Sequence, residues 1–377
     1  MIEALYVHIP FCEAKCNYCD FTSFSGCSEE TKEQYVEALK REALRQKGLF
    51  PMHLKSIFFG GGTPTCLSSG LLVHLLNFLC THFPIADNIE ISTEANPGTI
   101  DREKLTLLKN GGVNRISLGI QSFNPYQLQR LGRIHTEQQA FEAYNLVREA
   151  GFANVNIDLM YGLPEQGIED WQNTLQKVIT LNPEHISLYQ LKIECGTPLG
   201  DEYKSGVLGE FDDEQALKMY RAAIDTLGQK GYIHYEISNF ARRGFKSRHN
   251  QMYWLTRPYL GLGAGAHSYL PPYRKENIGD LQKYTDSLLK GEAAPSFNEK
   301  ISTNMAMAET MFMGLRLLDG VNIEEFSKRY NTNSFQVFSD PIKKCISNGL
   351  LEVKGNRIRL TEKGLYLGNL VFEEFLL

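Results

Sequence analysis

The first half of the chain repeats one pattern of apolar and polar positions. A short run of β-branched or aromatic residues is followed by a turn and then by an amphipathic stretch with helical spacing. In residues 29–47, for example, Tyr35, Leu39 and Ala43 recur on one face. Strands that alternate with helices predict a parallel sheet with right-handed crossovers. The six runs are ALYVHI, SIFFGG, IEISTEA, RISLGI, VNIDLMYG and HISLYQLKI.

Six repeats can form either a doubly wound sheet or a partial barrel, and the polar residues distinguish the two. Residues 60–63, Glu94, Gln121, Asp158 and Gln190 stand at or just after the ends of five strand runs. Both architectures place ligands at strand ends, but a site drawn from five strands favours a barrel rim. We therefore expect an α/β fold with a partial (β/α)6, TIM-like barrel over residues 1–230.

The pattern changes after this first region. Residues 231–295 are less regular, and we expect them to form a connecting segment. Residues 296–377 predict three helices and a hairpin around Gly355-Asn356, which is typical of a winged-helix-like C-terminal domain. The predicted wing carries only Lys354, Arg357 and Arg359, so packing or partner docking is favoured over DNA binding.

Composition and charge restrict the class of protein. The 377 residues are 42% hydrophobic and carry a net charge of −5, which argues against a broad contact with nucleic acid. No segment reaches the roughly 18 apolar residues of a membrane span, and the first residues lack a signal-peptide pattern. Three of the eight cysteines fall within eight residues, which is not a disulfide framework. We expect a soluble, cytoplasmic protein and leave peripheral membrane contact open.

The three clustered cysteines carry the strongest chemical signal. Cys12, Cys16 and Cys19 form a C-x3-C-x2-C motif directly after the first predicted strand. A tight loop of thiolates suits a [4Fe–4S] cluster, and three ligands for four irons leave one iron open to the amino and carboxylate groups of S-adenosylmethionine (SAM). A zinc loop would need a second pair of Cys or His residues, which the sequence does not provide at matching spacing.

The segment LYVHIPFCEAKCNYCDF resembles the radical SAM superfamily, and within it the anaerobic coproporphyrinogen oxidase branch. This resemblance implies that a reduced cluster passes an electron to SAM and cleaves it to methionine and a 5′-deoxyadenosyl radical. It also implies an electron donor for the cluster. Gly60 to Pro64 match the GGGTP element of the family, in which glycines allow close approach of the backbone to a ligand.

The same resemblance implies a SAM site along successive strand ends. An acid there can accept from the methionine ammonium, an arginine can bind its carboxylate, and Gln121 with Asp158 can bind the ribose hydroxyls. Tyr6 and Tyr18 are expected to shield the cluster or pack on SAM. The expected SAM residues are Tyr6, Tyr18, Gly61, Gly62, Thr63, Glu94, Gln121, Arg133 and Asp158.

Two further features resemble the HemW-type haem chaperones. Phe21 stands where the compared oxidases have a fourth cysteine, and His249 to Trp254 match an HNxxYW element. The resemblance implies haem as cargo, haem-accepting client proteins that include membrane clients, and His249 as a candidate iron ligand. A packed aromatic turn with a structural histidine is the alternative for this motif. For the whole chain, the alternatives are a coproporphyrinogen III oxidase and a non-catalytic iron–sulfur protein.

Overall fold

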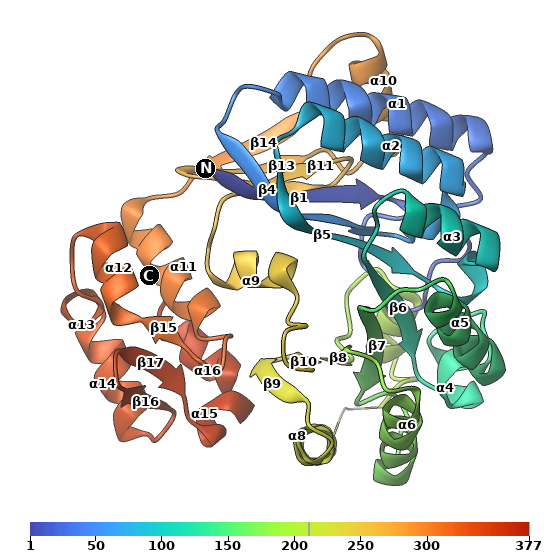
Figure 1. The fold of residues 1–377 in the computed structure, drawn as a ribbon. Coiled ribbons are helices and arrows are strands. Elements are labelled where there is room, and N and C mark those ends of the chain that lie inside the picture. Colours follow the sequence, from blue (N-terminus) through green and yellow to red (C-terminus); the bar gives the residue numbers. More distant parts are fainter. Residues whose placement is uncertain (210–211, 377) are drawn as a thin grey trace.

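The computed structural model describes residues 1–209 and 212–376, and its centre is a curved sheet (Figure 1). Six parallel strands lie side by side in the order in which they follow along the chain, and each coincides with one of the six predicted runs. The partial TIM-like barrel is therefore confirmed. These strands are β1 (Ile2–Ile9), β4 (Met52–Gly61), β5 (Ile85–Ala95), β6 (Arg115–Gln121), β7 (Val155–Tyr161) and β8 (His185–Gln190).

Helices cover the convex face of this sheet (Figure 1). The predicted helix over residues 29–47 is α1 (Glu29–Gln46); the Ser28 side chain accepts from the Thr31 N–H at its start, and Tyr35, Leu39 and Ala43 are buried. The other helices of this region are α2 (Ser69–His82), α3 (Arg102–Asn110), α4 (Pro125–Arg130), α5 (Glu137–Glu149), α6 (Ile168–Leu181), α7 (Pro198–Lys204) and α8 (Asp213–Gln229), with 3-10 turns at Pro64–Cys66 and Pro97–Thr99.

Residues 231–295, expected as a connecting segment, add strands to both edges of the same sheet. At one edge, β10 (Asn239–Ala241) pairs antiparallel with β8 and with β9 (Ile233–Glu236). At the other edge, β11 (Tyr259–Leu262) runs parallel to β1. The antiparallel strands β12 (His267–Leu270) and β13 (Tyr273–Asn277) follow, and α10 (Leu281–Leu289) packs on α1. The strand β14 (Ser296–Lys300) pairs antiparallel with β13, so these residues belong to the sheet and not to the C-terminal domain that was predicted to begin at residue 296.

One short helix of this segment, α9 (Arg248–Trp254), lies on the concave side of the sheet, opposite α1 and α2 (Figure 1). It contacts β4 and β1. The HNxxYW element therefore packs inside the open barrel, on the face away from the covering helices.

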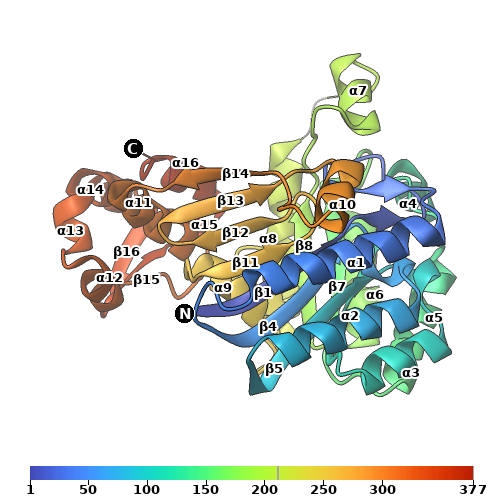
Figure 2. The same cartoon turned by 90° about the horizontal axis from the view of Figure 1, so that it is seen from above.

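The C-terminal residues form a separate unit at one end of the sheet (Figure 2). The predicted helices and hairpin are present as α11 (Thr303–Gly314), α12 (Ile323–Tyr330), α14 (Ser339–Ser347), β16 (Leu351–Lys354) and β17 (Arg357–Leu360). This unit has its own apolar core, which includes Met311, Phe326, Ile342 and Phe375. The pattern did not predict β15 (Val321–Asn322), α13 (Ser334–Val337), α15 (Glu362–Tyr366) or α16 (Gly368–Glu373). Of the helices in the described residues, none has the length and apolar character needed to cross a bilayer.

Candidate functional site

The cysteine loop lies at the carboxyl ends of the parallel strands. Directly after β1, the short strand β2 (Phe11–Cys12) pairs with β3 (Phe24–Ser25) and closes the loop at its base. The main chain of Asn17 holds the middle of the loop in place. Its N–H donates to the Leu131 carbonyl at 3.0 Å, and its carbonyl accepts from the Leu199 N–H at 3.0 Å. Segments distant in sequence thus hold the three thiols at the barrel rim.

A cavity of about 350 Å³ opens beside this loop. The strand ends of β4 to β7 and the loop after α4 supply its other walls, so residues predicted from six separate segments meet here. Tyr6 and His249 lie outside its lining. The predicted residues that line it are Cys12, Cys16, Tyr18, Cys19, Gly61, Gly62, Thr63, Glu94, Gln121, Arg133 and Asp158.

The thiols are held in a partly buried environment. Burial raises the pKa of the Cys12 and Cys19 thiols, so their charged forms need compensating partners. Thr63 Oγ1 lies 3.8 Å from Cys12 Sγ, and an Arg133 Nη1–H donates to Cys16 Sγ at 3.4 Å. In the described chain no three His, Cys, Asp or Glu side chains converge on a single ion. In a cluster each thiolate binds a different iron, so wider spacing of the thiols is compatible with it.

The glycine-rich end of β4 passes directly beneath the cysteine loop. Gly61 has a φ of +113°, and a Cβ at this position would lie 2.5 Å from an atom of the His8 ring. A Cβ on Gly62 would lie 2.7 Å from the Phe11 carbonyl oxygen and 3.0 Å from Cys12 Sγ. The Gly62 N–H donates to the Ile9 carbonyl at 2.9 Å. Both glycines are therefore required for the loop and the strand to approach each other.

Two carboxyl groups share the inner wall of the cavity. Glu94 accepts from the Gly61 N–H at 3.1 Å, and burial, together with the nearby Asp158, raises the pKa of Glu94 to about 8. Burial also raises the pKa of Asp158, although hydrogen bonds from Ser117 Oγ at 2.9 Å and Asn156 Nδ2 at 2.8 Å oppose the shift. A cationic ligand group would stabilise the charged form of either acid.

Gln121 ends β6 with a left-handed φ of 67°. Its Oε1 is buried and has no hydrogen-bond partner among the described residues. A buried amide oxygen without a donor is unfavourable, and a ligand with hydroxyl groups in this cavity would satisfy it.

Arg133 joins the cysteine loop to the strand ends. Burial alone would lower the pKa of its guanidinium, but the Cys16 thiol and Tyr18 hold it above its usual value. Its Nη2 donates to the Gly119 carbonyl and, at 2.6 Å, to Asn96 Oδ1. The charged arginine therefore lies against the Cys16 thiol at the edge of the cavity.

Several lining residues were not predicted. Asn96 is two positions after Glu94 on the same strand end, and its Nδ2 donates to Thr63 Oγ1 at 2.8 Å. Tyr189, not the expected Gln190, faces the cavity, and Gln190 lines a different one. Alternation of side chains along β8 explains this difference. The same alternation could have indicated Ser117, which stands four residues before Gln121 and also lines the cavity.

His249 is buried inside the barrel. Its Nδ1 lies 2.9 Å from Ser56 Oγ and its Nε2 lies 2.8 Å from the Tyr253 hydroxyl, so both ring nitrogens are occupied. Burial lowers the pKa of His249 to about 3. The ring also stacks on Phe58, and Tyr6 lies beside both rings. In this arrangement His249 anchors α9 to β4, and ligation of iron would require it to release one hydroxyl partner.

Tyr6 belongs to the layer below the cavity. Its hydroxyl lies 2.9 Å from His8 Nδ1, and His8 Nε2 lies 2.8 Å from the Thr22 carbonyl. The His8 ring in turn fills the space beside Gly61. Tyr6 thus supports the glycine-rich strand end from beneath and does not face the cavity.

The sequence of this chain is similar to known protein families and to curated proteins from two bacteria. Residues 6–178 match the radical SAM superfamily, and residues 301–367 match the HemN C-terminal domain. A relative from Bacillus subtilis (strain 168), described as "Heme chaperone HemW", is 36% identical over 100% of this chain and 99% of its own length. A protein with the same description from Lactococcus lactis subsp. lactis (strain IL1403) is 37% identical over 100% of this chain and 97% of its own length.

Among solved structures, a coproporphyrinogen III oxidase (HemN) from Escherichia coli, described as a radical SAM enzyme, is similar with a TM-score of 0.86. It is 26% identical to this chain, and the match covers 99% of this chain and 90% of the oxidase.

Proposed function

This chain belongs to the HemW family within the radical SAM superfamily, and from that premise we propose that it is a haem chaperone, which binds haem and delivers it to client proteins. The likeness to relatives described as haem chaperones, at 36% and 37% identity over full length, carries the proposal. The oxidase of similar fold is only 26% identical. Phe21, in place of a fourth cysteine, also favours the chaperone over the oxidase.

We propose that Cys12, Cys16 and Cys19 hold a [4Fe–4S] cluster. Their shared cavity, the Thr63 hydroxyl near Cys12 and the Arg133 guanidinium against Cys16 support this assignment. Both neighbours favour thiolate over thiol, which is the form that binds iron. When bound and reduced, such a cluster supplies an electron to SAM.

We propose that SAM occupies the same cavity. Gly61 and Gly62 let β4 approach the cysteine loop closely, and both line the cavity in which the methionine part of SAM would lie. Glu94 accepts from the methionine ammonium, Arg133 binds the carboxylate, and Gln121 with Asp158 binds the ribose hydroxyls. The unpartnered Gln121 Oε1 and the raised pKa of Glu94 support these roles. Thr63 and Tyr18 complete the wall, and Tyr6 supports it through His8.

The proposed function implies partners that the fold itself does not identify. An electron donor would reduce the cluster, and haem-accepting client proteins would receive the cargo. We propose that the protein works in the cytoplasm and meets some of these clients at the membrane. We propose no nucleic acid partner, in accordance with the net charge of −5.

Two parallel assays on the anaerobically reconstituted protein test the proposal. The first titrates the protein with haem and follows the Soret band, for which we expect saturable binding. The second supplies reductant, SAM and coproporphyrinogen III, for which we expect no protoporphyrinogen IX. Accumulating protoporphyrinogen would favour the oxidase, whose likeness in fold makes it the second candidate. Absence of both SAM cleavage and haem binding would favour a non-catalytic iron–sulfur protein.

A further inference from the structure

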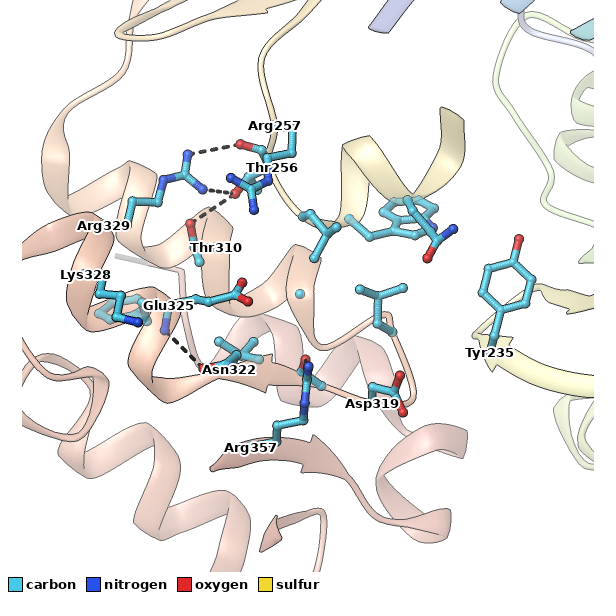
Figure 3. Close-up of a pocket in the computed structure, with 18 of the residues that line it drawn as sticks. Tyr235, Thr256, Arg257, Thr310, Asp319, Asn322, Glu325, Lys328, Arg329 and Arg357 are labelled. Carbon is cyan, nitrogen blue, oxygen red and sulfur yellow. Dashed lines mark hydrogen bonds between the residues drawn. The ribbon is translucent and has the colours of Figure 1, made fainter. Parts of the chain in front are cut away.

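A second cavity, of about 810 Å³, lies between α9 and the C-terminal unit (Figure 3). The residues after α9 form one side of it, and α11, α12 and β17 form the other. It shares no lining residue with the cysteine cavity. Its volume lies within the range of about 300–1,000 Å³ that is common for small-molecule sites.

One part of the lining is apolar and aromatic. It includes Trp254, Leu255, Val321 and Phe326. The Arg316 guanidinium lies 4.4 Å from the centroid of the Trp254 ring, which fixes the indole at the cavity wall. The Trp254 Nε1–H is buried and finds no acceptor among the described residues. This wall suits a large flat ligand that also carries acceptor groups.

The charged residues of the lining are mainly cationic. Five basic side chains stand against two carboxylates, Asp319 and Glu325, although the whole chain carries a net charge of −5. A local excess of positive charge in an acidic protein indicates an anionic ligand. The basic residues are Lys246, Arg257, Lys328, Arg329 and Arg357.

These cationic side chains differ in whether they are free to bind a ligand. Arg329 donates to the Thr256 hydroxyl and carbonyl at 2.5 and 3.0 Å (Figure 3). Arg357 donates to the Gly320 carbonyl at 3.1 Å. Arg257 and Lys328 are exposed, and their side chains make no hydrogen bond or ion pair within the described chain. Lys246 also has no hydrogen bond or ion pair there, but its Nζ lies 5.5 Å from the centroid of the Tyr235 ring. The two exposed cations, Arg257 and Lys328, match a ligand with two carboxylates.

We propose that this cavity is the cargo site, and that it holds the tetrapyrrole by its faces and its two propionates without a protein ligand to the iron. The inference rests on the proposed function, because that function supplies the tetrapyrrole. None of the described lining residues is His, Cys or Met. The Tyr235 hydroxyl is already held by His185 Nε2 at 2.8 Å and by the Ser247 N–H at 3.2 Å.

Iron should therefore contribute little to affinity. We expect the full-length protein to bind metal-free protoporphyrin IX with a Kd within about threefold of that for haem, and to bind protoporphyrin IX dimethyl ester at least about tenfold more weakly, since the ester lacks both negative charges. Equilibrium titrations followed by porphyrin absorbance and emission measure all three. Binding of haem without binding of the metal-free porphyrin would overturn the proposal.

Charge reversal tests the location. The double variant R257E/K328E should weaken haem and metal-free porphyrin alike by at least about tenfold, because each lost charge contact is equivalent to several-fold in Kd. The matched control R243E/K354E reverses the same residue types at exposed positions that do not line the cavity. It should bind as the wild type does. Melting curves of both variants report whether each folds.

The possible results distinguish a failure of the proposed cargo site from a failure of the proposed function. Wild-type protein that binds neither porphyrin would overturn the proposed function and this inference with it. Wild-type binding that survives R257E/K328E, or that falls equally in R243E/K354E, would leave the chaperone standing and reject the cavity. Haem binding that is lost in H249A but kept in R257E/K328E would place the cargo at α9 instead.

Discussion

Among single residues, Cys16 gives the most direct test of the proposed cluster. Its thiol accepts a hydrogen bond from Arg133 at 3.4 Å and lines the 350 Å³ cavity. A cluster with only three protein thiolates should not survive the loss of one, so C16A should lose most of its iron and its brown colour after anaerobic reconstitution. Iron and sulfide are counted per chain. C80A, which removes a cysteine on α2 outside the cavity, should keep the wild-type iron content.

Glu94 makes SAM binding dependent on pH. Its pKa of about 8 means that the carboxyl is mostly protonated at pH 6, and a neutral acid attracts the methionine ammonium only weakly. We expect SAM to bind reconstituted wild-type protein at least about tenfold more weakly at pH 6 than at pH 8, because about 1% of Glu94 is charged at pH 6 and about half at pH 8, where the amino group of SAM is still roughly half in its ammonium form. Equilibrium dialysis across this range measures the affinity.

The control for this prediction is E94Q, which cannot titrate at this position. The amino group of SAM titrates in both proteins, so the difference between the two pH profiles isolates Glu94. Parallel profiles for wild type and E94Q would show that Glu94 does not contact the ammonium.

Much of the site could be predicted because the resemblance to the radical SAM superfamily singles out its residues. The glycines and acids stand at strand ends and Arg133 lies in the loop after α4, and the structure brings these residues to one cavity. Tyr189 and Asn96 were not singled out because tyrosine and asparagine are common at strand ends for other reasons. Only the alternation of side chains along each strand distinguishes the inward position.

Helix α9 carries the HNxxYW element, and it packs inside the barrel, which the sequence did not predict. The motif was expected to present His249 to a ligand, yet its ring bonds Ser56 and Tyr253 inside the barrel. The spacing of His249 and Tyr253 on one helix is compatible with their contact. Nothing in residues 248–254 alone could reveal the contact with Ser56, which belongs to β4, 193 positions away. His249 as a haem ligand stays a prediction.

His249 should make the stability of the protein sensitive to acid. Its pKa is about 3 in the folded protein and about 6.5 in an unfolded chain, so the unfolded chain takes up the proton first as pH falls. The stability that the neutral ring contributes is complete above about pH 6.5 and is lost progressively from there towards pH 3. Between pH 7 and pH 5 we expect a loss of about 2 kcal/mol from this group.

Urea unfolding of wild type and H249Q at pH 7 and pH 5 checks this prediction. H249Q retains a side chain that can hydrogen bond but does not titrate, so its free energy of unfolding should fall less between the two pH values. Other buried histidines and acids titrate in both proteins and cancel in the comparison. If the free energy of unfolding fell equally in both proteins, protonation of His249 would not destabilise the folded state.

The strands that the pattern missed have a common physical cause. β9 to β13 are three to five residues long, too short for the alternation of apolar and polar positions to be recognised. Their partners are also distant, since β11 pairs with β1 and β10 pairs with β8. The six central strands were predictable because each contains a short run of β-branched or aromatic residues, largely buried, that is followed by a turn.

For the whole molecule, we propose the domains as residues 1–230, 231–295 and 296–377. The separate core of the C-terminal unit supports a third domain, but β14 (Ser296–Lys300) still pairs with β13 in the barrel sheet and moves the last boundary to about residue 300. The strands that residues 231–295 add to the sheet tie this segment closely to the barrel. The barrel and the C-terminal unit also share main-chain contacts, since the Ile237 N–H donates to the Arg316 carbonyl at 3.1 Å and the Leu318 N–H donates to the Tyr235 carbonyl at 3.1 Å.

One ion pair across this junction provides the last prediction. Arg274 on β13 donates to both carboxylate oxygens of Glu309 on α11 at 2.9 Å, and the Glu309 side chain is only 7% exposed. Removing the arginine leaves a buried charge without its partner. Because Arg274 itself is 37% exposed, water compensates in part, and we expect R274A to cost about 2 kcal/mol of unfolding free energy.

A double-mutant cycle separates the lost pair from the lost packing. E309Q removes the buried charge, so R274A should cost less in the E309Q background than in the wild type, which gives a favourable coupling energy of about 1 kcal/mol or more. R102A is the matched control, since Arg102 pairs with Glu149 where both side chains are exposed, and it should cost less than about 1 kcal/mol. A coupling energy near zero would mean that the junction is held by its apolar and main-chain contacts, and that charge at Arg274 does not fix the C-terminal unit against the barrel.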